Sequence, residues 1–182
     1  MFTTGLMQLH RGGKVTNAHK GQYDGVSITT FAAGTAELYE WLDENRDVAF
    51  LPVDIVNAPE VIARNREMIT INGALAVDLN GQVVADTIGG RQFSGIGDHE
   101  DFISQSGLSL SDRSLVCLRS TSQVEGVTIS RIIPQLPEGW IVTTPRHQLD
   151  LVVTEHGVAH LRGRTVRERA HALAEIAAPQ IG

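Results

Sequence analysis

The pattern of apolar and polar positions along the chain predicts an α/β fold assembled from short elements. Runs of apolar and β-branched residues with the length of strands recur throughout: 26–31, 48–56, 68–79, 82–88, 114–118, 127–133, 140–145 and 150–155. Apolar residues at helical spacing occur in further segments: 5–12, 36–45 and 59–67. Leu6 and Leu9 share one face of the first expected helix. Pro52 indicates an edge position or a bulge within its expected strand.

Capping and turn residues mark where several of these elements begin and end. Thr35 is the expected N-cap of the second helix. Asn80-Gly81 lies between two apolar runs and predicts a hairpin. Thr165 and Glu168 have the spacing of a capping box, which predicts a last helix whose Ala and Leu face packs on the sheet. The tail, 178–182, is expected to fray.

The order of these elements predicts one domain over residues 1–182, with a mixed sheet and flanking helices. A chain of 182 residues, of which 42% are hydrophobic and 20% charged, has an ordinary globular composition and can bury a core. The sequence contains no internal repeat and no obvious linker. We therefore expect a single α/β domain.

Charge and hydropathy narrow the classes of function and location. The net charge of −6 and the pI of about 5.6 argue against nucleic-acid binding, which requires a basic surface. No apolar run reaches the length of a membrane span, about 18 residues. The start of the chain lacks the pattern of a secretory signal, and the single cysteine excludes an internal disulfide. A cytoplasmic location is expected.

A glycine-rich stretch, residues 89–97, is the most informative local feature. It follows an expected strand and precedes the acidic cluster Asp98-His99-Glu100-Asp101. Consecutive backbone amides in such a turn can bind an oxyanion or a phosphate. The alternative is a tight connection without a ligand. The spacing matches neither the dinucleotide-binding fingerprint nor the P-loop.

Glu155 and Asn57 stand at the ends of expected strands, where α/β proteins tend to bind ligands. Each has a simpler interpretation, a surface glutamate for Glu155 and an N-cap for Asn57. Cys117 lies in the middle of a strand and is interpreted as a buried, inert thiol.

Histidines near carboxylates raise the alternative of a metal hydrolase. His99 lies within the acidic cluster, and His156 and His160 are four residues apart beside Glu155. Gly157 between the two histidines weakens a helical presentation. The acidic cluster is more simply a solvated loop, so no metal site is expected.

Long motifs give the chain a resemblance to a known family. The stretches N-G-A-L-x-V-D-L-x-G-Q-V at 72–83, S-G-I-G-x-x-x-D-F at 94–102 and V-T-E-H-G-V-A-x-L-R-G at 153–163 are specific, and matching segments run almost from end to end. The sequence resembles the acetyl-CoA hydrolase/transferase family, which includes 4-hydroxybutyrate and acetate CoA-transferases. The resemblance implies the C-terminal domain of a CoA-transferase, with the NagB/RpiA-like fold.

The resemblance also implies a reaction. A glutamate attacks an acyl-CoA thioester, and a glutamyl-CoA intermediate then passes CoA to a carboxylate. The family's nucleophile would fall immediately before Met1, because residues 1–6 match the segment that follows it. The family's N-terminal half would complete the site. Coenzyme A is a substrate here, and no permanently bound cofactor is implied.

Site residues are carried over by their matching positions. Asn57 matches an active-site asparagine, and Glu155 matches a second active-site glutamate associated with the carboxylate substrate. Gly95, Ile96 and Gly97 match the first positions of a loop that supplies an oxyanion-hole amide. Its fourth position, usually glycine, is Asp98, whose carboxylate would oppose a developing oxyanion. A family lysine after the 114–118 strand is also absent, because 122–126 reads Ser-Gln-Val-Glu-Gly.

These residues leave two main hypotheses. In the first, the chain is one half of an enzyme acting on short-chain acyl-CoA and a small carboxylate, inactive until an N-terminal half completes it. In the second, it is a truncated, non-catalytic domain that binds CoA or forms oligomers, including a possible homodimer. Because the acyl pocket is expected to be shared with the other half, the sequence does not define the acyl group.

Overall fold

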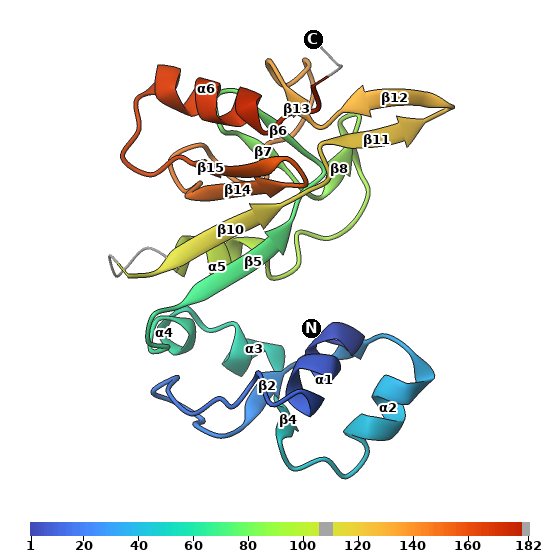
Figure 1. Ribbon diagram of the computed structural model, residues 1–182, viewed down its shortest axis with the longest axis vertical. Helices are drawn as coiled ribbons and strands as arrows, with labels where there is room; N and C mark the ends of the chain where they lie inside the picture. Colours follow the sequence, from blue (N-terminus) through green and yellow to red (C-terminus); the bar gives the residue numbers. More distant parts are fainter. Residues whose placement is uncertain (106–110, 180–182) are drawn as a thin grey trace. The chain divides into compact units, whose positions relative to one another are not determined.

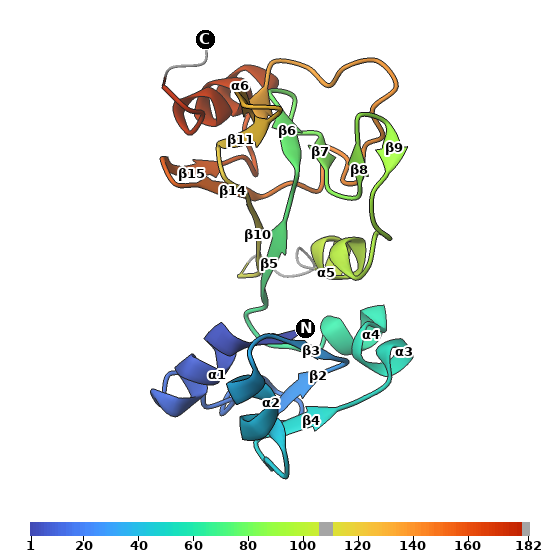
Figure 2. The same ribbon diagram turned by 90° about the vertical axis from the view of Figure 1, so that its right-hand side faces the viewer.

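The computed structural model describes residues 1–105 and 111–179. The chain separates into two compact units, Met1–Glu67 and Met68–Gly182 (Figures 1 and 2). No composition shift marks this boundary in the sequence, and the interpretation as one domain stays a prediction.

The first unit combines short parallel strand pairs with short helices. Its elements, in chain order, are β1 (Phe2–Thr3), α1 (Thr4–Arg11), β2 (Ser27–Thr29), β3 (Ala32–Ala33), α2 (Ala36–Leu42), β4 (Val48–Phe50), α3 (Val53–Val56) and α4 (Pro59–Ile62). Strand β1 pairs with β3 and β2 pairs with β4, both in parallel. A small core of Phe2, Met7, Leu38 and Val48 holds α1 and α2 against these strands.

Helix α1 forms where the sequence predicts it, but it buries a different residue. Thr3 caps the helix, with its Oγ1 accepting the Leu6 N–H at 3.3 Å. Met7 is fully buried, Leu6 packs at the core margin and Leu9 is exposed, so the predicted Leu6–Leu9 face is wrong in part.

The predicted strand 48–56 is wrong beyond Phe50. Pro52 precedes helix α3 with φ of −56°, a backbone conformation that proline favours at a helix start. Thr35 precedes α2 as expected, but its side chain forms no capping bond. Its amide instead donates to Thr4 Oγ1 at 3.1 Å, which ties the start of α2 to α1.

The second unit carries the larger sheets and the main core. Its elements are β5 (Ile69–Gly73), β6 (Ala76–Asp78), β7 (Val83–Val84), β8 (Thr87–Ile88), β9 (Arg91–Gln92), α5 (His99–Gln105), β10 (Arg113–Cys117), β11 (Thr121–Val124), β12 (Val127–Ser130), β13 (Ile132–Ile133), β14 (Leu151–Thr154), β15 (Gly157–His160) and α6 (Val166–Glu175).

A four-stranded mixed sheet in the order β15-β14-β10-β5 organises this unit. Strands β5, β10 and β14 are parallel, and β15 returns antiparallel to β14 as a hairpin. A second sheet has the order β13-β6-β7. Mixed sheets with flanking helices confirm the predicted α/β class, although the sequence reading missed β15.

The main core lies against one face of the four-stranded sheet. Val116, Val152 and Ala159 from the sheet meet Ile103 of α5 and Leu173 of α6, all buried. In Figure 1, α6 lies beside β15 and β14, and Figure 2 shows α5 beside β5 and β10. The apolar face of α6 therefore packs as predicted.

Local chemistry fixes several of the connections. Thr165 and Glu168 form the predicted capping box, with the Thr165 N–H donating to Glu168 Oε2 at 2.8 Å. The predicted hairpin at Asn80-Gly81 joins β6 to β7 and is closed by the Gly81 N–H donating to the Asp78 carbonyl at 2.8 Å.

Further sequence expectations differ from the structure or lie beyond it. The predicted strand 140–145 is wrong, because only Thr144 of this stretch bridges to a strand, at Val83. The expected strands 68–79, 82–88 and 127–133 are each divided between two strands, and the expected helix 59–67 ends at Ile62 as α4. Of the tail 178–182, residues 180–182 lie outside the described residues.

Candidate functional site

Glu155 lies at the carboxyl end of β14, next to the carboxyl end of the parallel strand β10. The register pairs Cys117 with Val153, so the residues that follow these two positions leave the sheet side by side. A pocket of about 430 Å³ opens here, lined by Cys117, Leu118, Arg119, Val153, Thr154 and Glu155. This edge of an α/β sheet is where ligands commonly bind.

Ser120 holds the Glu155 carboxylate through both of its oxygens. The Ser120 N–H donates to Oε2 at 2.9 Å, and the Ser120 hydroxyl donates to Oε1 at 2.8 Å. Ser120 is buried, whereas the Glu155 side chain is 45% exposed. The Ser120 amide, the amide of Glu155 itself and the Ser120 hydroxyl together lower the pKa of Glu155 to about 2.

A carboxylate with this pKa is a fixed anion at neutral pH. It is a weak proton acceptor, because efficient general bases have pKa values near the working pH. Its remaining lone pairs can still accept hydrogen bonds from a ligand N–H or O–H. Glu155 is therefore suited to orienting a ligand. The sequence reading singled out Glu155 but missed Ser120, whose place after β10 was the available signal.

The glycine-rich stretch 89–97 is mostly exposed, includes strand β9, and is held by hydrogen bonds to Asp86. The Asp86 carbonyl accepts the N–H groups of Phe93 and Ser94 at 2.9 and 3.1 Å. The Asp86 carboxylate accepts the Thr143 hydroxyl at 2.6 Å, and hydrogen bonds from Thr143 and Gln92 lower its pKa. Asp86 thus ties residues 92–94 to Thr143.

Gly95, Ile96 and Gly97 are exposed, and Gly97 has φ of +61°. Asp98 directly precedes α5, and its carbonyl accepts the Phe102 N–H at 3.2 Å. The backbone at these positions can present amide groups to solvent. Their service as an oxyanion hole stays a prediction.

The acidic cluster is not the solvated loop that the sequence indicates. His99 begins α5 and is buried, with its Nε2 2.9 Å from Thr144 Oγ1. Thr144 also donates a hydrogen bond to Glu100. Burial lowers the pKa of His99, while Glu100, Asp98 and Asp86 act in the opposite direction. The neutral imidazole is therefore the form that the fold favours.

Asn57 belongs to the first unit, where it follows helix α3 as its C-cap residue. The expected N-cap role is therefore wrong, because the next helix, α4, is preceded by Ala58. Glu155 and the Gly95–Asp98 turn belong to the second unit. Convergence of Asn57 with these groups on one thioester stays a prediction.

The histidine pair near Glu155 lies on a hairpin rather than a helix. His156 occupies the turn between β14 and β15, with its Nε2 3.9 Å from Glu155 Oε1, and His160 pairs with Leu151. Over residues 1–105 and 111–179, no group of three or more His, Cys, Asp or Glu side chains is arranged to hold a metal ion.

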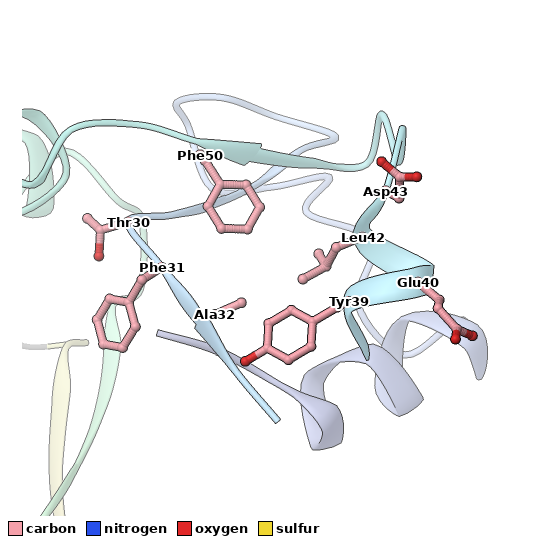
Figure 3. A pocket seen from close by; sticks show the side chains of 8 residues that line it. All are labelled: Thr30, Phe31, Ala32, Tyr39, Glu40, Leu42, Asp43 and Phe50. Carbon is pink, nitrogen blue, oxygen red and sulfur yellow. The ribbon is translucent and has the colours of Figure 1, made fainter. Parts of the chain in front are cut away.

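The first unit has an apolar pocket that the sequence reading missed. It has a volume of about 770 Å³ and is lined by Thr30, Phe31, Ala32, Tyr39, Glu40, Leu42, Asp43 and Phe50. Figure 3 shows Ala32, Tyr39, Leu42 and Phe50 around one hollow, with the Glu40 carboxylate directed away from it. Exposed apolar side chains gathered around a hollow mark either a contact surface or a ligand-binding groove.

Comparison with known proteins decides the family. The pattern of the acetyl-CoA hydrolase/transferase C-terminal domain matches residues 34–181. The chain belongs to the acetyl-CoA hydrolase/transferase family. It is 43% identical over 180 residues to the 4-hydroxybutyrate coenzyme A transferase of Clostridium kluyveri, covering 99% of this chain and 42% of the relative. It is 41% identical to the succinyl-CoA:cyclohexane-1-carboxylate CoA transferase of Geobacter metallireducens, covering 98% of this chain and 40% of that protein.

Solved structures of the family have the same fold. RipA from Yersinia pestis superposes with a TM-score of 0.87 at 38% identity, over 98% of this chain and 40% of RipA. The 4-hydroxybutyrate CoA-transferase of Porphyromonas gingivalis gives a TM-score of 0.78 at 36% identity, over 98% of this chain and 41% of that protein. These neighbours confirm the predicted CoA-transferase fold.

The family consists of enzymes, and its members include proteins named CoA-transferases and acetyl-CoA hydrolases. This chain spans about 40% of the length of the first relatives that it matches. Within the described residues, no helix is both long and apolar enough to cross a bilayer.

Proposed function

We propose that this chain is the C-terminal part of an enzyme that transfers CoA between short-chain acyl groups and small carboxylates through a glutamyl-CoA intermediate. The nucleophilic glutamate comes from the part of the enzyme that corresponds to the relatives' remaining length. The chain by itself is then inactive in acyl transfer.

The ionised Glu155 in a pocket with both apolar and polar lining residues, Arg119 among them, is the observation that carries this proposal. Cys117, Leu118 and Val153 line a space of about 430 Å³, within the range of small-molecule sites. Glu155 at its rim accepts an N–H or O–H of the bound acyl-CoA or acceptor, while Ser120 keeps the carboxylate in place. Its pKa of about 2 makes it a poor base, which favours a positioning role over that of the nucleophile.

The turn at Gly95–Asp98 is the second element of the proposed mechanism. A backbone amide of this turn stabilises the oxyanion that forms when a carboxylate attacks the thioester carbonyl. Asp86 holds the residues that lead into this turn, because its carbonyl accepts the N–H groups of Phe93 and Ser94. This supports the role, since pre-positioned donors need little reorganisation during the reaction. Asp98 beside the turn weakens the stabilisation, because its negative charge opposes that of the oxyanion.

A chimera tests the proposal. In it, this chain replaces the matching 42% of the C. kluyveri 4-hydroxybutyrate coenzyme A transferase. We expect the isolated chain to show no transfer between acetyl-CoA and a carboxylate and the chimera to show turnover, with borohydride trapping a glutamyl-CoA thioester. Turnover by the isolated chain would overturn the proposal that the nucleophile lies elsewhere.

Glu155→Gln in the chimera should lower kcat/KM at least about tenfold, the scale on which one positioned polar contact acts. Glu175→Gln, on the exposed side of α6, is the matched control. A folded but inactive chimera would instead favour the second candidate, a non-catalytic domain that binds CoA. The departures from the family's motifs at Asp98 and at 122–126 argue for this candidate.

A further inference from the structure

The register of the four-stranded sheet places a band of apolar side chains on one face. Ile71, Leu115, Leu151 and His160 are paired across the sheet, as are Gly73, Cys117, Val153 and Val158. Residues paired directly across a sheet share a face, so both rows point the same way. We call this surface the open face and define it by its apolar members Ile69, Ile71, Leu115, Cys117, Val153 and Val158. Two exposed polar residues belong to the same face at its margins, Arg113 beside Ile69 and His160 beside Leu151.

Most of the open face is accessible to solvent. Ile69, Ile71 and Val158 are 60%, 69% and 48% exposed. Leu115, Cys117 and Val153 are partly exposed, and Leu151 in the same band is buried. A contiguous exposed apolar surface on a monomer marks a contact site.

The opposite face of the same sheet is largely covered. Its residues alternate with those of the open face, and Val116, Val152 and Ala159 are buried beneath α5 and α6. Predominantly parallel sheets are normally covered on both faces, because their crossover connections place helices there. The described part of this chain supplies the helical layer for one face of the sheet.

The open face runs directly into the Glu155 pocket. Cys117 and Val153 belong to both, and Glu155 follows Val153 by two positions along β14. Whatever covers the open face therefore also lies over the proposed acyl-CoA pocket.

We propose that the open face seats an apolar helical layer from the portion of a CoA-transferase polypeptide that lies outside the matched 42% of the C. kluyveri relative. This inference rests on the proposed function, since it names the partner surface that closes the Glu155 site. The partner segment is rich in Leu, Ile or Val, and these side chains pack against Ile71 and Leu115.

The size of the surface favours this occupant over a second copy of the chain. Four strands about 4.8 Å apart, four or five residues long at about 3.3 Å per residue, present roughly 250–300 Å². A stable complex between separate proteins buries about 800 Å² per partner. A segment of the same polypeptide needs less area, because its tether keeps the local concentration high.

Cys117, the only cysteine of the sequence, is partly exposed on the open face and not buried as the sequence indicates. Its reactivity therefore reports on whether this face is covered. We would measure the rate of maleimide labelling of Cys117, by the mass of its peptide, in the isolated chain and in the chimera. We expect labelling in the isolated chain and at least a tenfold slower rate in the chimera. As a control, Arg167→Cys on α6 is combined with Cys117→Ser. The thiol at position 167 should react with maleimide at the same rate in the isolated chain and in the chimera.

A charge on the open face should undo the protection. Ile71→Arg in the chimera should restore the fast labelling of Cys117, while Val166→Arg, on α6 and similarly exposed, should not. Equal Cys117 rates in chain and chimera overturn the proposal. Slow labelling of Cys117 in the dilute isolated chain would also overturn it, because the chain would then cover its own open face. Slow labelling that occurs only when the isolated chain has a doubled mass would overturn it too, because a second copy would then cover the face. If Cys117 is protected in a chimera that shows no turnover, the proposed covering of the open face is supported, and only the proposed transferase function is overturned.

Discussion

Ser120 supplies a hydrogen-bond donor to each carboxylate oxygen of Glu155, from 35 positions earlier in the chain. Strands β10 and β14 run parallel, so the residues that follow them meet at the same edge of the sheet. The buried serine and the accessible glutamate form a rigid anionic site. A carboxylate that is fixed before a ligand arrives is suited to orienting that ligand.

Ser120→Ala should raise the pKa of Glu155 above its value of about 2 while leaving it below the ordinary 4.5, since the Ser120 amide remains. A group whose pKa is lowered by folding stabilises the fold above its unfolded pKa, and this contribution is lost as the pH falls through the folded value. Between about pH 4.5 and 2, the free energy of unfolding of the variant should therefore fall less steeply with decreasing pH than that of the native chain. Carbon-detected NMR titration of glutamate measures the pKa, with Ser122→Ala as the control. An unchanged pKa would show that the hydroxyl does not act on Glu155.

Local signals in the sequence predicted the parts of the fold that depend on few neighbouring residues. The Asn80-Gly81 turn and the Thr165–Glu168 capping box are decided within four residues, and both formed as expected. The stretch 140–145 is rich in β-branched residues, but strand formation requires a partner, and only Thr144 finds one. Pairing partners are non-local, and a single sequence does not display them.

The candidate site shows the same division. Its place at the end of an apolar strand was enough to predict Glu155 as a site residue. Its partner Ser120 could not be predicted in the same way, because their contact depends on the parallel alignment of β10 with β14. His99 was misread because charged neighbours on both sides suggested exposure. The structure buries its ring against Thr144, which contributes a hydroxyl from 45 residues away.

The buried His99 should make stability sensitive to mild acid. Burial lowers its pKa below 6.5, although Glu100, Asp98 and Asp86 oppose the shift. A histidine with a lowered folded pKa keeps the fold stable above pH 6.5 and destabilises it as the pH falls toward the folded pKa. Urea unfolding at pH 7.5 and 5.5 should show a smaller difference for His99→Gln than for the native chain. Equal differences would contradict a neutral, buried His99.

A side chain at Gly90 should destabilise the fold more than a side chain at the adjacent Gly89. A Cβ on Gly90, where φ is +76°, would lie 2.5 Å from the Gly139 carbonyl oxygen, whereas a Cβ on Gly89, with φ of +57°, meets nothing within 4 Å. We expect Gly90→Ala to lower the free energy of unfolding by about 2–4 kcal/mol, from backbone strain plus overpacking. Gly89→Ala should cost only about 1–2 kcal/mol, from strain alone. Urea unfolding of both variants gives the comparison, and equal losses would show that the Gly139 contact has no energetic weight.

Asp98 should limit the rate of the assembled enzyme through its charge. Asp98→Asn in the chimera removes the negative charge beside the proposed oxyanion site while keeping a side chain of the same shape. Because removal of about 1 kcal/mol of adverse electrostatics corresponds to a several-fold rate change, we expect kcat to rise about three- to tenfold with little change in KM. Asp98→Gly should give a similar increase if charge is the cause, and a larger one if backbone freedom at this position also contributes. Asp101→Asn, within α5, controls for the loss of one negative charge from the same region. An unchanged or lower kcat in both Asp98 variants would remove this carboxylate from the mechanism.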